Sequence, residues 1–64
     1  MTKITDKQMI FANEYLIDLN ATRAYKKAYP NVKKDSVAAS AAVRMLRNVK
    51  VKEYIDEQLK KIED

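Results

Sequence analysis

The chain has no glycine and a single proline in its 64 residues. Tight β-hairpin turns need positive φ angles, which glycine adopts at the lowest cost. A chain without glycine is therefore expected to avoid hairpins and to join helices through loops that Asn, Asp or Pro begins. We predict an all-α fold, a bundle of three or four helices, formed by one domain that spans residues 1–64.

Four stretches carry apolar residues at helical spacing, and each follows a residue that can cap a helix N-terminus. Thr5 and Gln8 fit a capping box, in which each side chain accepts a hydrogen bond from the other residue's backbone N–H. Asn20, Asp35 and Asn48 are the expected caps of the next three helices. The helices are predicted over four ranges: about 6–18, 21–29, 36–47 and 49–62.

The apolar faces of these helices predict how they pack. The first helix has Phe11 and Tyr15 beside a stripe made of Met9, Ala12, Leu16 and Leu19. The inner face of the third is mostly alanine, which permits a neighbouring helix to approach closely: Ala38, Ala41, Ala42, Met45 and Leu46. The fourth carries a narrow seam of Val51, Ile55, Leu59 and Ile62. Four tyrosines are predicted to pack at these faces with wet hydroxyl groups rather than to stack on bases: Tyr15, Tyr25, Tyr29 and Tyr54.

Composition argues against catalysis and metal binding. The chain lacks both cysteine and histidine, so it has no thiolate ligand, no imidazole ligand and no imidazole base. No pair of carboxylates sits in an apolar setting that would separate their pKa values. We therefore expect no enzyme activity, no catalytic residues, no metal and no cofactor. No apolar run approaches the roughly 20 residues of a membrane span, and no secretory signal begins the chain, which favours a cytosolic protein.

Positive charge is concentrated in the middle of the chain. Residues 23–52 hold nine of the thirteen basic side chains and one acid, Asp35, which gives +8 in a protein whose net charge is +4. Such concentration repels itself, so it favours a polyanionic partner, with a merely soluble basic surface as the alternative. Nucleic acid is the commonest partner of this kind.

The second and third predicted helices have the layout of a helix-turn-helix. Pro30 disfavours helical geometry at the residue before it, so the second helix should end near Tyr29. In a helix-turn-helix, the second of the two helices lies in the major groove of DNA. The outer face of this helix carries two hydroxyls and two guanidinium groups, which can contact bases or phosphates: Ser36, Ser40, Arg44 and Arg47. The alternative is that the arginines only solvate the C-terminal end of a core helix and favour its dipole.

Four lysines flank the turn: Lys26, Lys27, Lys33 and Lys34. Lysine is a flexible point charge that suits phosphate and discriminates poorly between bases. We expect these lysines to position the protein on the DNA backbone, with a solvated loop as the alternative. Lys50 and Lys52 begin the fourth helix, where cations oppose the helix dipole, and this placement is a further weak indication of a functional surface.

Two stretches of the sequence resemble the small subunits of tailed-bacteriophage terminases. The first stretch contains Lys7-Gln8, Phe11, Glu14-Tyr15-Leu16, Asp18, Asn20-Ala21-Thr22 and Ala24-Tyr25. The second contains Leu46-Arg47-Asn48, Lys50-Val51 and Tyr54-Ile55. Together they cover about residues 7–55 in the order and spacing of that family. The chain departs from many relatives at Ala28-Tyr29-Pro30, where those proteins have Ala-Gly-Tyr and a shorter loop.

The resemblance implies an N-terminal domain that binds double-stranded DNA through a helix-turn-helix. Such subunits recognise viral DNA in the host cytoplasm and pass it to the terminase large subunit, which supplies the ATPase and nuclease activities. The resemblance also implies homo-oligomeric rings that assemble through a region C-terminal to this domain. Because the sequence stops at Asp64, we expect a fragment or a very short relative, and a monomer for this piece alone.

Two other functions remain open from the sequence. The same helix-turn-helix can serve a transcription regulator that binds an operator. The basic face can also belong to a protein-interaction module with an acidic partner.

Overall fold

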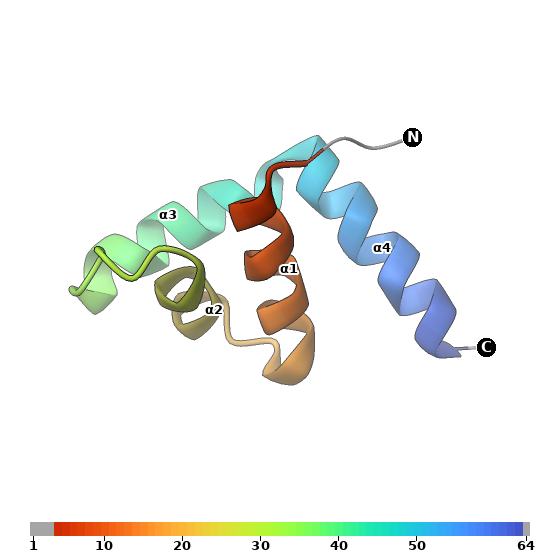
Figure 1. Ribbon diagram of the computed structural model, residues 1–64, viewed down its shortest axis with the longest axis horizontal. Helices are drawn as coiled ribbons and strands as arrows, with labels where there is room; N and C mark the ends of the chain where they lie inside the picture. The colour runs from red at the N-terminus through yellow and green to blue at the C-terminus, as the bar shows by residue number, and fades with distance from the viewer. Residues whose placement is uncertain (1–3, 64) are drawn as a thin grey trace.

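The computed structural model describes residues 4–63 and folds them into four helices without a strand. They are α1 (Asp6–Asp18), α2 (Ala21–Ala28), α3 (Asp35–Arg47) and α4 (Val49–Glu63). Figure 1 shows α1 at the centre, with α2 and α3 to one side of it and α4 to the other. The all-α prediction is confirmed, and the predicted helix bounds agree with the observed ones to within one residue. None of these helices is long and apolar enough to cross a lipid bilayer.

Three of the predicted caps are confirmed. Thr5 Oγ1 accepts a hydrogen bond from the Gln8 N–H at 3.1 Å, and Gln8 Oε1 accepts one from the Thr5 N–H at 2.9 Å. Asn20 Oδ1 accepts from the N–H three residues further on, at 3.0 Å. Asn48 Oδ1 accepts from the N–H two residues further on, at 2.9 Å. Each bond satisfies a backbone donor that has no partner inside its own helix.

The prediction that Asp35 caps the third helix is wrong. The residue at the cap is Lys34, which makes no side-chain capping bond, and Asp35 is the first residue of α3. Its carboxylate lies in the first turn, where the helix dipole favours a negative charge, and pairs with Lys26 of α2. The second helix ends at Ala28, because Tyr29 already has non-helical angles, φ −127° and ψ 77°, before Pro30.

The hydrophobic core is built around Phe11, whose side chain is fully buried. Tyr15 stacks on its ring at 6.1 Å between centroids, and Tyr25 meets it edge-on at 6.2 Å. The other buried members of this cluster are small or β-branched and come from all four helices: Ala12, Ala24, Ala28, Ala42, Val51 and Ile55. Alanine at these positions lets the helix backbones approach one another closely.

The tyrosines pack at the edge of this core, as predicted. All four are partly buried against it. Tyr25 and Tyr29 stack at 4.5 Å, and the Lys7 ammonium lies 5.1 Å from the centre of the Tyr29 ring. The Tyr54 hydroxyl donates to Asn13 Oδ1 at 2.8 Å and so ties α4 to α1. Because these rings are engaged with the protein, they are not arranged as a platform for unpaired bases.

The predicted apolar stripe of the first helix is partly wrong. Met9 is 39% exposed and Leu19 is 63% exposed, because α1 turns Phe11 and Ala12 toward the other helices. Leu19 lies beyond the end of α1 in the left-handed conformation, φ 57°. Glycine usually takes this position, and a residue with a side chain does so at a cost of about 1 kcal/mol or more. On α4, Leu59 is 40% exposed, and the side chain of Ile62 lies outside the described residues.

Phe11→Ala is expected to remove most of the stability of the domain. Truncating a buried phenylalanine costs about 3–5 kcal/mol, which is as much as a core of this size supplies. Thermal denaturation followed by far-ultraviolet circular dichroism measures the loss. The matched control is Ile17→Ala on the same helix, where the side chain is 72% exposed and the expected change is within about 0.5 kcal/mol. Equal melting temperatures for the two variants would contradict this description of the core.

Candidate nucleic-acid interface

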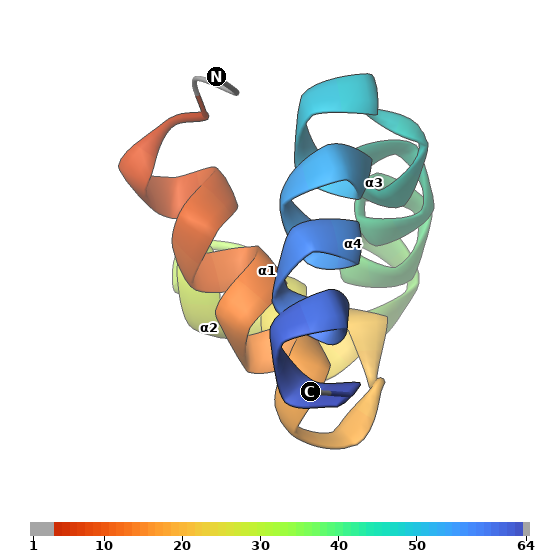
Figure 2. The same ribbon diagram turned by 90° about the vertical axis from the view of Figure 1, so that its right-hand side faces the viewer.

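The basic part of the sequence folds into α2, a connection over residues 29–34, and α3. The Val32 N–H donates to the Tyr29 carbonyl at 3.0 Å and forms the turn that follows Pro30. Alanines of both helices are buried where α2 and α3 pack: Ala24, Ala28, Ala38 and Ala42. This packing turns the opposite face of α3 outward, and α3 lies at one edge of the molecule in both views (Figures 1 and 2).

The outer face of α3 carries the four residues predicted for groove contact, and all four are exposed: Ser36, Ser40, Arg44 and Arg47. Their spacing places them along one stripe of the helix. Of the lysines, Lys33 and Lys34 are exposed just before α3 begins, and Lys27 is exposed in the last turn of α2. Seven of the eight predicted residues are therefore exposed, and six of these lie on α3 or directly before it.

Lys26, the eighth predicted residue, is already paired. Its ammonium lies 2.7 Å from Asp35 Oδ1, and the pair joins α2 to the first turn of α3. The two residues also line an open groove between these helices, together with Asn20, Thr22, Arg23, Ser36 and Ala39. Part of the positive charge of Lys26 is compensated by the one acid of the basic stretch, which sequence reasoning did not anticipate.

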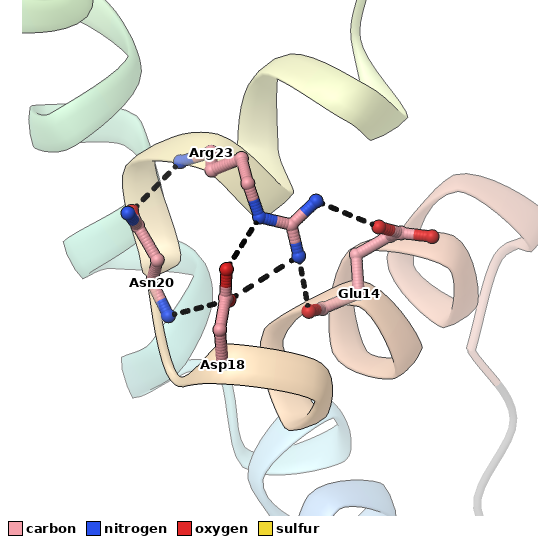
Figure 3. A network of polar contacts seen from close by, with 4 residues as sticks. All are labelled: Glu14, Asp18, Asn20 and Arg23. Atoms are coloured by element: carbon pink, nitrogen blue, oxygen red, sulfur yellow. Dashed lines mark hydrogen bonds and ion pairs between the residues drawn. The ribbon is translucent and has the colours of Figure 1, made fainter.

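Arg23 is also committed within the protein, at the junction of α1 and α2 (Figure 3). Its guanidinium donates to Glu14 Oε1 at 2.9 Å, to the Glu14 carbonyl at 2.7 Å and to Asp18 Oδ2 at 2.8 Å. The Asn20 N–H donates to the same Asp18 carboxylate at 3.1 Å. The signal in the sequence was two acids one helical turn apart on α1, followed closely by an arginine.

These contacts shift the pKa values of the pair. The hydrogen bond from Arg23, and then the one from the Asn20 backbone, lower the pKa of Asp18. The same bond to Asp18, and then the one to Glu14, raise the pKa of the Arg23 guanidinium. Arg23 therefore joins α1 to α2 through Glu14 and Asp18, and its guanidinium is already engaged within the protein.

Replacing Arg23 by alanine is expected to raise the pKa of Asp18 toward the ordinary value of about 3.9. An NMR titration of the Asp18 carboxyl carbon measures this shift. Because the folded-state pKa is lowered, the stabilisation from Asp18 is present above about pH 4 and is lost as the pH falls through the lowered pKa. Arg47→Ala on α3 is the control and should leave the Asp18 titration unchanged. An unchanged pKa in Arg23→Ala would show that the network does not persist in solution.

The structure adds two valines that the sequence had not assigned to this surface. Val37 is 51% exposed and Val43 is 48% exposed, both on the outer side of α3. Lys50 and Lys52 are exposed in the first turn of α4, and Lys52 lines a second groove beside Arg47. Helical spacing identified the alanine-rich inner face and the polar outer stripe of α3, and neither valine was assigned to one of them.

A small all-α bundle whose basic residues gather on two successive helices and the connection between them is the class of structure that these observations define. Comparison with known proteins narrows this class to one family. Residues 4–64 match the family model described as terminase small subunit. The terminase small subunit of Staphylococcus phage 80alpha is 39% identical over 61 residues, which make up 95% of this chain and 40% of that protein.

The chain belongs to the terminase small subunit family. The resemblance identified in the sequence is thereby confirmed. The chain spans about 40% of the length of the phage 80alpha relative. No solved structure gives a significant match.

Proposed function

We propose that this domain binds double-stranded DNA and, as part of a terminase small subunit, selects viral DNA for packaging by the large subunit. Family membership supports the packaging role. The observation that carries the DNA-binding role is the outer face of α3, where Arg44 and Arg47 are both exposed. In this role the domain acts by binding and positioning, and it needs no cofactor.

In the proposed complex, α2 and α3 act as a helix-turn-helix. The outer face of α3 enters the major groove, which is wide enough to admit a helix. Arg44 and Arg47 lie three residues apart and so reach neighbouring bases or phosphates, and each can bind guanine O6 and N7 through two hydrogen bonds. Ser36 and Ser40 supply hydroxyl groups that donate to or accept from base edges.

The lysines around the turn hold the DNA backbone in this arrangement. Lys27, Lys33 and Lys34 are exposed and carry flexible ammonium groups that suit phosphate oxygens. Lys26 reaches a phosphate only by exchanging its bond to Asp35, so we expect it to contribute less than the other three. Binding by a single domain of this size is expected to be weak. Several copies joined in a homo-oligomer would raise the overall affinity through effective concentration.

Replacing Arg44 or Arg47 by alanine is expected to weaken duplex binding about tenfold, within the 1–3 kcal/mol range of a good arginine contact to a base. Both side chains are exposed, so helicity should be unchanged. Fluorescence anisotropy with a labelled duplex measures the affinity, and circular dichroism measures the helicity. Lys61→Ala removes the same charge from the far end of α4 and serves as the matched control.

The salt dependence of binding reports how many phosphate contacts the surface makes. Each phosphate contact releases counterions, so the logarithm of the binding constant should fall steeply and linearly with the logarithm of salt concentration. Loss of one phosphate contact should reduce that slope by about 1. If neither arginine variant differs from Lys61→Ala, the outer face of α3 is not the DNA-binding surface. Preference for an acidic protein over DNA at equal salt would favour an interaction module instead.

A further inference from the structure

Two exposed valines border the polar stripe on α3. Val37 is 51% exposed and Val43 is 48% exposed. Successive residues of a helix are turned by about 100°. Around α3 the outer residues therefore follow one another over about 120° of its surface, in the order Val43, Ser36, Arg47, Ser40, Arg44 and Val37. The valines thus form the two apolar edges of the surface proposed to enter the major groove.

The hydrophobic core does not use the valines at these two positions. Neither residue belongs to the buried cluster or to the apolar residues packed against it. Valine is also less favourable than alanine in a helix, because its branched side chain loses rotamer freedom. The other small apolar residues of α3 are alanines. Alanine would expose less apolar surface to water than valine at positions 37 and 43. A binding role accounts for the larger and stiffer side chain.

We infer that Val37 and Val43 contact the C5-methyl groups of thymine and so determine which DNA sequences this domain prefers. This inference rests on the proposed function. In the major groove, the methyl group is the one apolar feature of the base edges, and apolar side chains recognise it. The two valines are six residues apart, which is about 9 Å along the helix axis. That distance suits thymines about two to three base-pair steps apart, at about 3.4 Å per step.

This assignment gives the arginines and the valines of α3 different roles in binding. Arg44 and Arg47 supply charge, so their contribution falls with salt. The valines supply apolar contact, so they change the preference between sequences and leave the number of released counterions unaltered. Ser40 lies between the two valines on the helix surface and can take a polar contact at the intervening bases.

The test uses duplexes that the chain itself selects from a random-sequence library. At each selected thymine, one duplex carries thymine and its partner carries uracil, which lacks only the C5-methyl group. We expect uracil at one or two positions to weaken binding about threefold to fivefold, the size expected for burying one methyl group. In Val37→Ala or Val43→Ala, the thymine and uracil duplexes should bind equally at the corresponding position, with an unchanged salt slope.

These variants are expected to fold, because alanine is the better helix former. Ile17→Ala, an exposed apolar truncation on α1, is the matched control and should keep the preference for thymine. Equal binding of the thymine and uracil duplexes by the unaltered chain would overturn the inference, as would selection that enriches no sequence. Both results leave DNA binding itself intact, whereas failure to bind any duplex at low salt would overturn the proposed function.

Discussion

Close packing of α2 against α3 through alanine is the constraint on which the proposed interface depends. Ala24 and Ala28 of α2 and Ala38 and Ala42 of α3 are each at most 4% exposed. Because these side chains are small, the two helices can pack closely, with Met45 and Leu46 of α3 beside them against the core. Phe11 of α1 lies in the same buried cluster as Ala24, Ala28 and Ala42, together with Val51 and Ile55 of α4. The arrangement of charge on the surface is a consequence of this packing.

The basic side chains of residues 23–52 make different kinds of contact. Arg23 binds Glu14 and Asp18 and fixes α1 to α2. Lys26 binds Asp35 and joins α2 to the start of α3. A count of basic residues in the sequence therefore overstates the charge that is free to meet a phosphate. The charge that remains exposed lies on and around α3, which is also where the alanine packing leaves a face open.

Local signals in the sequence predicted the helices and three of their caps. Thr5, Asn20 and Asn48 cap because a short polar side chain next to a free N–H needs no partner from elsewhere in the fold. Some outcomes that depended on contacts between helices differed from the prediction. Asp35 was expected to cap α3, and it joins the helix and pairs with Lys26 instead.

The residues of the candidate site were predictable where they depended on local helical geometry, and they were not predictable where they depended on contacts between helices. Helical periodicity placed Ser36, Ser40, Arg44 and Arg47 on one face, and a face is a local property. The same geometry places Val37 beside Arg44 on that face, but an apolar side chain gives no sign by its type that it will be exposed. The partners of Arg23 are Glu14 and Asp18 of α1, so these ion pairs also depend on how two helices pack.

The most direct measurement is an NMR titration of this chain with duplex DNA, which maps contacts and tolerates weak binding. We expect the largest shifts of backbone resonances along the outer face of α3, from Ser36 to Arg47, and at Lys33 and Lys34. Shifts concentrated on the acidic part of α4, with α3 unaffected, would contradict the proposed interface.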